Sequence, residues 1–353
     1  LLLLEGFLRV FLMATGRDIR HYQPVFAFDA KARDRSRFTS HPFLPYAQRA
    51  FDRRKLSTYR EDIHRTVDLD YTLNSLGFRT PERPFEKPMK VKRVITLGGS
   101  TTFDGPTNEQ TWSALLENKL NVYYSETGFK VEVINLSMDA AASPTSLINL
   151  AFIGLQFRPD LVLNYDGVND SIFIGYEDLA PDYRNAIERF DENRPPVRSR
   201  MSPWMFRSYF LSIGSAALDI ILKRSDLYAQ LTGSKLSKLQ PANNEIKGIE
   251  YLERNLKLMR AISGEYHAKF MAATAHWVHP ESKVQKMNAE LRAFFEDENI
   301  GYLDLDQALP HDDWTIHVDQ VHWTLKGENE VSDRWKEQVT KRDLLELNGL
   351  RPQ

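Results

Sequence analysis

Four short polar segments contain the residues whose types and spacing could support chemistry. They are 98–102 (GGSTT), 135–140 (NLSMDA), 167–170 (GVND) and 319–322 (DQVH). A serine hydroxyl becomes a strong nucleophile when a neighbouring imidazole takes its proton, and a carboxylate fixes the tautomer of that imidazole. Ser100, His322 and Asp319 supply these three groups. We therefore predict a triad with Ser100 as the nucleophile, His322 as the general base and Asp319 as the acid that orients it.

Acyl transfer by such a triad also needs hydrogen-bond donors for the oxyanion that develops in the transition state. Three donors are available: the backbone N–H of Ser100, the backbone N–H of Ala140 and the side-chain amide of Asn169. Each segment is weak evidence by itself, because Gly-Gly-Ser after a strand is often a turn or a phosphate site, and Gly-x-Asn-Asp is commonly a β-turn. Their combination, in this order along the chain, favours an acyl-transfer site.

Alternating strands and helices must position these segments. Short β-rich runs predict strands at 91–99, 130–135, 161–165, 270–275 and 302–305, and amphipathic or capped stretches predict helices at 111–125, 143–157, 246–267, 282–298 and 325–347. This alternation is typical of a parallel sheet with helices on its faces. The first three polar segments then lie just past the carboxyl ends of strands, where an open α/β sheet gathers its catalytic groups.

Two local signals mark the expected helix starts. Thr107-Asn-Glu-Gln110 resembles a capping box ahead of the helix at 111–125. Ser143-Pro144 places an N-cap residue and a helix-start proline ahead of the next helix. The fourth polar segment, 319–322, lies in the loop before the last helix and can fold back over the same edge of the sheet.

The four segments together resemble the sequence blocks of the SGNH (GDSL-type) hydrolase superfamily. The resemblance covers residues 91–335, apart from 171–250, and includes the entry to the third strand at 159–162 (PDLV). It implies a three-layer, flavodoxin-like α/β fold that hydrolyses esters, often O-acyl groups on carbohydrates, without a metal or cofactor. It also implies that Ser100 is the nucleophile, that Asn169 is an oxyanion donor, and that His322 is the base. The expected substrate is a small-molecule or glycan ester.

Two positions depart from the family pattern. The family usually has a glycine where this chain has Ala140, and the added methyl group narrows the space and restricts φ although the N–H survives. Asp104 replaces a glycine that follows the serine block, and it places a carboxylate near the serine loop. These changes leave open a second hypothesis, a catalytically weak or inactive SGNH-fold protein that serves as an accessory or scaffold subunit of a membrane assembly.

The chain opens with a mostly apolar stretch at 1–16 (LLLLEGFLRVFLMATG), interrupted only by Glu5 and Arg9. At ~1.5 Å per residue a helix of this length reaches about 24 Å, short of the ~30 Å hydrocarbon core of a bilayer. We expect the exit end of a transmembrane helix or an interfacial helix, with residues missing upstream of the leading leucines. An amphipathic helix packed on the protein's own core is the alternative. The prediction is a membrane-associated protein whose catalytic domain is extracytoplasmic, either periplasmic or extracellular.

Three further regions are expected along the chain. Residues 17–90 show weak patterning and predict an N-terminal extension with little regular structure, in which 74–79 (NSLGFR) also resembles membrane-tethered bacterial members of the superfamily. Residues 91–350 form the hydrolase-like domain. It contains a helical insertion at about 171–250, with helices expected near 204–213 and 216–231. Aromatic residues of the insertion belong to its core or form a lid over the substrate: Trp204, Phe206, Tyr209 and Phe210.

The composition excludes several classes of function. Among 353 residues, 46 lysines and arginines face 48 aspartates and glutamates, so there is no positive excess for binding nucleic acid. The absence of cysteine excludes disulfides, thiolate metal sites and cysteine nucleophiles. The spacing of His276, His279, His311 and His317 matches no standard ligand pattern, and we therefore expect no metal site.

Overall fold

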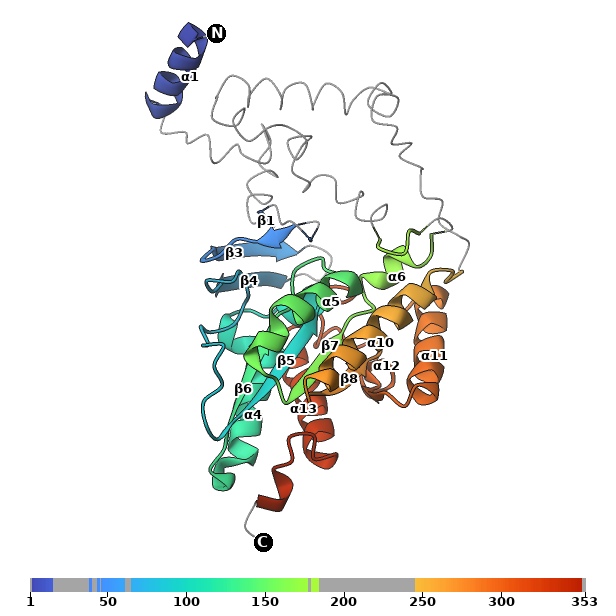
Figure 1. Ribbon diagram of the computed structural model, residues 1–353. Helices are drawn as coiled ribbons and strands as arrows, with labels where there is room; N and C mark the ends of the chain where they lie inside the picture. The colour runs from blue at the N-terminus through green and yellow to red at the C-terminus, as the bar shows by residue number, and fades with distance from the viewer. Residues whose placement is uncertain are drawn as a thin grey trace. The chain divides into compact units, whose positions relative to one another are not determined.

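The computed structural model describes residues 2–14, 38–39, 43–44, 46–60, 65–176, 179–183 and 245–350 (Figure 1). The chain forms two compact units. The first includes helix α1 (Leu2–Ala14) and the short paired strands β1 (Phe38–Thr39) and β2 (Ala47–Gln48). The second unit, residues 50–183 and 241–353, contains all the predicted site residues.

The second unit is built on a parallel sheet. Its strands are β5 (Val91–Gly98), β6 (Lys130–Asn135), β7 (Leu161–Tyr165), β8 (Lys269–Ala273) and β9 (Gly301–Leu303), in the order β6-β5-β7-β8-β9. Buried aliphatic side chains pair across the centre, where Ile95 lies opposite Ile134 on one side and Val162 on the other. Both faces of these strands are covered, which explains why their sequences are continuous apolar runs. The predicted α/β fold with a parallel central sheet is confirmed.

The strand order places a topological switch point between β5 and β7. The chain leaves β5 through α4 (Trp112–Tyr123) to the edge strand β6, and returns through α5 (Ser143–Phe152) to β7. The first crossover moves to one side of β5 and the second moves back past it to the other side. Because both crossovers are right-handed, α4 and α5 lie on opposite faces of the sheet. Three further helices complete the layers, with α13 (Leu325–Lys341) against α4, α10 (Ile249–Glu265) against α5, and α11 (Ser282–Asp297) beside α10 (Figure 1). The crevice at the carboxyl ends of β5 and β7 is where such a sheet holds its ligand.

Two predicted helix starts are wrong in detail. Thr107 does not cap α4, because a short 3-10 turn, η2 (Asn108–Gln110), intervenes and Thr111 caps the helix with its hydroxyl. Ser143 lies inside α5 and not at its N-cap. Its hydroxyl donates to the buried carboxylate of Asp170 at 2.6 Å, and this bond takes the oxygen away from the helix terminus.

The N-terminal extension contains regular structure that was not expected from its sequence. β3 (Arg53–Arg60) and β4 (Arg65–Thr72) form an antiparallel hairpin. The strands carry many charged residues, so they lack the hydrophobic alternation from which strands are usually recognised. At the end of the hairpin, Tyr71 packs against Phe103 of α3 (Ser100–Phe103), the short helix that begins at the predicted nucleophile.

Within the described residues, no helix has the length and apolar character needed to cross a bilayer. Helix α1 has 13 residues, and the side chains of Leu4, Phe7 and Val10 are exposed on it. The helices predicted within 204–231, and the four aromatic residues named there, lie outside the described residues. The helix predicted at 246–267 is α10.

Candidate active site

Ser100 lies at the sharp turn where β5 ends and α3 begins. Gly98 has a φ of 153°, and a Cβ there would lie only 2.5 Å from the carbonyl oxygen of Tyr165. A Cβ on Gly99 would lie 2.4 Å from the side-chain nitrogen of Asn169. Both positions therefore require glycine, because the serine turn approaches the segments after β6 and β7 too closely for a side chain.

The three residues of the predicted triad come together at this turn. Oγ of Ser100 lies 2.8 Å from Nε2 of His322, and Nδ1 of His322 donates to Oδ2 of Asp319 at 2.7 Å. The other oxygen of Asp319 accepts the backbone N–H groups of Val321 and His322, each at 2.9 Å. One turn therefore presents both the carboxylate and the imidazole, in agreement with the expected effect of the Asp-x-x-His spacing.

Hydrogen bonds fasten the loop that carries this turn to its surroundings. The N–H of Val278, in the loop after β8, donates to the carbonyl oxygen of Gln320 at 2.8 Å. The indole N–H of Trp323 donates to the carbonyl oxygen of Thr101 at 3.2 Å. These bonds hold the imidazole of His322 over the serine turn, although the two segments are far apart in the sequence.

The three predicted oxyanion donors lie on segments that contact one another. The side-chain amide of Asn169 donates to the carbonyl oxygen of Ala141 at 2.6 Å, and this carbonyl lies against Gly99. Within the described part of the chain, the backbone N–H groups of Ser100 and Ala140 have no hydrogen-bond acceptor. The arrangement leaves these two backbone donors, and the second amide hydrogen of Asn169, available to a ligand.

Ala140 has a left-handed backbone conformation, with a φ of 57°. Glycine adopts this conformation freely, whereas a residue with a Cβ pays roughly 1 kcal/mol for it. The chain therefore keeps a backbone course suited to glycine and holds an alanine in it at some cost. The departure from the family pattern at this position changes the side chain without removing the turn.

A buried polar network anchors the turn that carries Asn169. Asp170 is fully buried and accepts the hydroxyl groups of Ser143 at 2.6 Å and Tyr183 at 2.9 Å. Burial raises the pKa of Asp170, and these donors counteract it. Burial, followed by the charge of Asp170, raises the pKa of Asp166 to about 7. The last residue of the Gly-x-Asn-Asp segment thus ties the turn to the start of α5.

The charges around His322 stabilise its protonated form. Burial lowers the pKa of His322, but Asp104 and then Asp319 more than offset burial and raise the pKa to about 9. Burial tends to raise the pKa of Asp319, and the hydrogen bond with His322 together with its charge brings it below the ordinary value. Oδ2 of Asp104 lies 3.6 Å from Nε2 of His322. The second departure from the family pattern therefore acts directly on the predicted base.

Arg79 supports the serine turn, a role that was not anticipated from the sequence. Its side chain is almost fully buried and donates to the carbonyl oxygens of Phe103 at 2.9 Å and Gly105 at 2.6 Å, on either side of Asp104. The guanidinium also stacks on the ring of Tyr71, 4.4 Å from its centroid. The only sequence signal was the resemblance of 74–79 to tethered members of the superfamily. That resemblance did not indicate which residues the arginine contacts.

Three of the four histidines considered as metal ligands stack their rings on one another. Among the described residues, no group of three or more histidine, aspartate or glutamate side chains is placed to hold a metal ion. His276 and His317 are fully buried and stacked with ring centroids 5.1 Å apart, His311 also stacks on His276, and His279 is exposed. Burial lowers the pKa of His276 to about 3 and that of His317 to about 4, so both rings are neutral. His317 packs against Trp323, beside the loop of the triad.

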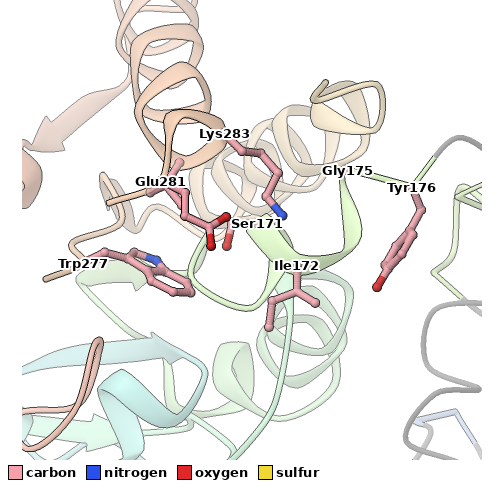
Figure 2. A pocket seen from close by; sticks show the side chains of 8 residues that line it. Ser171, Ile172, Gly175, Tyr176, Trp277, Glu281 and Lys283 are labelled. Atoms are coloured by element: carbon pink, nitrogen blue, oxygen red, sulfur yellow. The ribbon is translucent and has the colours of Figure 1, made fainter. Parts of the chain in front are cut away.

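A pocket of about 200 Å³ lies between α6 (Asp170–Phe173) and the start of α11 (Figure 2). Its lining combines aromatic, cationic and anionic side chains: Ser171, Ile172, Gly175, Tyr176, Trp277, Glu281, Lys283 and Val284. In Figure 2, Lys283 and Glu281 extend toward the space above Ile172, with the indole of Trp277 at its side. Helix α6 directly follows Asn169, and Trp277 precedes Val278, which bonds Gln320, so both walls are adjacent along the chain to segments that contact the predicted site.

Solved hydrolase structures resemble the chain, although no protein-family model and no curated protein match it. They include a lipase/acylhydrolase from Enterococcus faecalis (14% identity, covering 71% of this chain and 96% of that one, TM-score 0.44). An acetyl xylan esterase (14%, 70% and 99%, TM-score 0.44) and a psychrotrophic esterase from Pseudoalteromonas sp. (15%, 71% and 98%, TM-score 0.42) are further examples. Identities this low transfer no substrate and no catalytic role to this chain. With TM-scores below 0.5, these likenesses carry no argument about the family of this chain, whose α/β fold with a parallel sheet is seen in its own structure.

Proposed function

We propose that this protein is an SGNH-type serine ester hydrolase, with Ser100 as the nucleophile, His322 as the general base and Asp319 as the orienting acid. The observation that carries the proposal is the continuous line of contacts from Oγ of Ser100 to Nε2 of His322, at 2.8 Å, and from Nδ1 to Asp319, at 2.7 Å. This line lies at the carboxyl edge of the sheet beside the backbone N–H groups of Ser100 and Ala140, which have no acceptor among the described residues. A nucleophile, a base, an orienting acid and oxyanion donors are the groups that nucleophilic acyl transfer requires.

The proposed reaction proceeds in two halves. Neutral His322 takes the hydroxyl proton at Nε2 while Oγ of Ser100 attacks the acyl carbon. The tetrahedral intermediate collapses as the bond to the alcohol oxygen breaks, and the imidazolium gives its proton to that oxygen. Water then attacks the acyl-serine while His322 takes a proton from it; the imidazolium returns this proton to Oγ, and the acid is released. Asp319 stays ionised throughout and stabilises the imidazolium.

The oxyanion of each tetrahedral intermediate is proposed to bind the N–H of Ser100, the N–H of Ala140 and the amide of Asn169. Support comes from the two backbone donors, which have no acceptor within the described residues, and from the closeness of Asn169 to the serine turn. Removing one donor of an oxyanion hole typically lowers the rate by about 10²–10³. Removal of the side-chain amide of Asn169 should therefore lower the rate by about this factor.

An ester-hydrolysis assay tests the proposal. The wild-type protein should hydrolyse short-chain aryl esters, and Ser100→Ala should lower kcat by ~10⁴ or more. Ser125→Ala, at an exposed serine of the second unit, is the matched control and should leave the rate unchanged. Equal activity in the Ser100→Ala variant would rule out the proposed nucleophile.

We propose a carbohydrate ester as the substrate class, with the sugar ring in the pocket beside the site. Sugar hydroxyl groups both donate and accept hydrogen bonds, and the pocket offers the ammonium of Lys283 as a donor and the carboxylate of Glu281 as an acceptor beside the ring of Trp277. At about 200 Å³ the pocket is smaller than the roughly 300–1,000 Å³ of drug-sized sites, which suits one ring. Burial lowers the pKa of Lys283, and Glu281 counteracts it.

Substrate comparison separates this proposal from general esterase activity. Trp277→Ala and Lys283→Ala should raise KM for O-acetylated methyl glycosides severalfold and leave KM for p-nitrophenyl acetate unchanged. Lys286→Ala, an exposed lysine on the same helix outside the pocket lining, is the control. Parallel changes in KM for both substrates would show that the pocket does not select the sugar.

A second candidate function is an accessory or scaffold subunit that retains the fold with little or no catalysis. The left-handed Ala140, which the backbone holds at a cost, favours it. This candidate predicts that Ser100→Ala leaves the cellular function intact, whereas the hydrolase predicts loss of that function. Complementation of a deletion strain by the Ser100→Ala variant distinguishes the two.

We further propose that α1 attaches the protein to a membrane and that the hydrolase unit is extracytoplasmic. The exposed apolar side chains of Leu4, Phe7 and Val10 support the membrane contact, since an interfacial helix buries such a face among lipid headgroups. Glu5 and Arg9 form an ion pair at 2.8 Å within the helix, which lowers the cost of bringing both charges to a lipid surface. The extracytoplasmic side is inferred from the resemblance of 74–79 to membrane-tethered bacterial proteins.

A further inference from the structure

Asp104 occupies a position from which its carboxylate reaches the predicted base. It ends α3, and its N–H donates to the carbonyl oxygen of Ser100 at 2.7 Å, one helical turn back. Residues four apart on a helical turn share a face, so the side chains of Ser100 and Asp104 point the same way. Oδ2 of Asp104 lies 3.6 Å from Nε2 of His322, the nitrogen that also lies 2.8 Å from Oγ of Ser100.

Hydrogen bonds from Arg79 fix the backbone on both sides of Asp104. The guanidinium donates to the carbonyl oxygens of Phe103 and Gly105, the residues before and after Asp104. Within the described residues, His322 is the one basic side chain that lies within ion-pair distance of the Asp104 carboxylate. The guanidinium of Arg79 fixes the loop and acts on this carboxylate only at longer range.

Negative charges surround the imidazole from several elements. His322 faces Asp319 on its own turn, Asp104 at the end of α3 and Asp139 in the turn after β6. Burial raises the pKa of Asp104; the charges of His322 and Arg79 lower it, and those of Asp139 and Asp319 raise it. Asp319 binds Nδ1, where an orienting acid is needed, whereas Asp104 lies by Nε2, where the proton of the serine must arrive.

Two groups therefore compete for one nitrogen. When Nε2 carries a proton, the imidazolium pairs with Asp104 and has no lone pair with which to accept the proton of Ser100. With a pKa of about 9 for His322, about one molecule in a hundred holds the neutral imidazole at pH 7. Burial opposes the protonated form of His322, and the charge of Asp104 is the largest of the contributions that favour that form.

We propose that Asp104 is a positioning residue that pairs with protonated His322, holds the resting site in an inactive form near neutral pH, and confines activation of Ser100 to alkaline conditions. The inference rests on the proposed serine-hydrolase function and concerns the regulation of the same site. Its geometric basis is the contact between a carboxylate and the proton-accepting nitrogen of the base, at a position where the related sequence pattern has glycine.

The test is the pH dependence with which a fluorophosphonate probe labels Ser100, measured as a second-order rate from pH 6 to 10. In the wild-type protein the rate should rise with a midpoint near pH 9, the pKa of His322. In Asp104→Asn the midpoint should fall by about one pH unit or more, because a neighbouring charge commonly shifts a pKa by 1–3 units. The rate at pH 7 should then rise about tenfold or more, with the alkaline plateau little changed. Asp312→Asn, at an exposed carboxylate, should reproduce the wild-type curve.

The outcomes separate this inference from the proposed function. Labelling of the wild type with an unchanged midpoint in a folded Asp104→Asn overturns the role of Asp104 and leaves the hydrolase standing. No labelling of the wild type at any pH overturns the hydrolase instead. If Asp104→Asn does not fold, NMR titration of the wild-type protein decides the matter, with the His322 signal assigned by its loss in His322→Gln. A midpoint near 9 supports the inference, and one at or below the ordinary 6.5 overturns it.

Discussion

Trp323 donates its indole N–H to the carbonyl oxygen of Thr101 at 3.2 Å. This bond joins the residue after the proposed base to the residue after the proposed nucleophile. The contact between Ser100 and His322 is therefore supported by a second contact between their immediate neighbours. Trp323 is buried, and its ring also packs on His317 with centroids 4.5 Å apart.

Trp323→Phe should keep most of this packing and lose the hydrogen bond. We expect kcat to fall about tenfold or more with KM nearly constant, because small displacements of a base from its nucleophile are costly. The free energy of unfolding should fall by only ~1 kcal/mol. Steady-state kinetics and urea unfolding check both values, with Trp314→Phe, at a more exposed tryptophan, as the control. A variant with unchanged kcat would show that the bond does not align the site.

Arg79→Met should destabilise the second unit by about 2–4 kcal/mol, since two carbonyl oxygens lose a charged donor in a buried setting. Arg79→Lys should recover little, because a single ammonium cannot reproduce the fork of the guanidinium. Arg53→Met, at a largely exposed arginine of the hairpin, serves as the control. Urea unfolding measures the differences, and equal stabilities of the Arg79→Met and Arg53→Met variants would show that the bonds from Arg79 to the serine turn do not stabilise the unit.

Ala140→Gly should relieve the left-handed strain at a φ of 57°. The gain of roughly 1 kcal/mol is partly offset by the extra freedom of glycine in the unfolded chain, so the free energy of unfolding should stay constant or rise slightly. Ala114→Gly, inside α4, should instead lower it by ~1 kcal/mol. Thermal unfolding of the two variants decides the point: similar losses would mean that Ala140 is not strained.

The stacked imidazoles predict a loss of stability in mild acid. The folded-state pKa values of His276 and His317, about 3 and 4, lie below the ordinary 6.5, so the unfolded chain binds more protons as the pH falls. Stability is fully present above pH 6.5 and is lost progressively toward pH 4. Each ring should contribute about 2 kcal/mol of loss between pH 7 and 5.

Asp166 and His322, whose pKa values are raised in the folded state, contribute an opposing gain as the pH falls. The loss is therefore measured as the difference between the wild-type protein and a histidine variant in urea unfolding at pH 7 and 5. His317→Phe should flatten the pH dependence, because it removes one buried titrating ring and retains a planar side chain. His279→Asn, at an exposed histidine with a φ of 50°, should keep the wild-type slope, since asparagine tolerates that backbone conformation. A His317→Phe variant with an undiminished slope would assign the acid sensitivity to other groups.

The exposed face of α1 predicts binding to lipid vesicles. Phe7→Ser combined with Phe11→Ser should reduce the bound fraction in a flotation assay by tenfold or more, since each phenyl group buried in lipid is worth about 1.5–3 kcal/mol. Phe51→Ser, at an exposed phenylalanine of the second unit, is the matched control. Equal flotation of the double variant and the wild type would exclude α1 as the membrane contact.

The sheet and its polar edge could be predicted because their signals are local. β6 and β7 begin and end where the sequence indicated, since their runs of buried aliphatic residues stop at polar turns. The segments with Ser100 and Asn169 were then expected together, because such turns gather at one edge of a parallel sheet, and the loop with Asp319 was expected to fold back over that edge.

The remaining features depend on partners distant in the sequence. The hairpin of β3 and β4 is rich in charged residues, so no apolar alternation marks it. Arg79 bonds backbone carbonyls more than twenty residues away, and backbone acceptors leave no trace in side-chain patterns. The stack of His276 on His317 likewise joins two loops whose sequences give no sign of their contact.

The proposed nucleophile is tested most directly by covalent labelling with a fluorophosphonate probe at pH 9, followed by mass spectrometry of the intact protein and its peptides. The wild-type protein should gain a single adduct on the peptide that contains Ser100, and a folded Ser100→Ala variant should gain none. Equal labelling of both proteins, or a folded wild type that gains no adduct between pH 6 and 10, would contradict a serine hydrolase built on Ser100, His322 and Asp319.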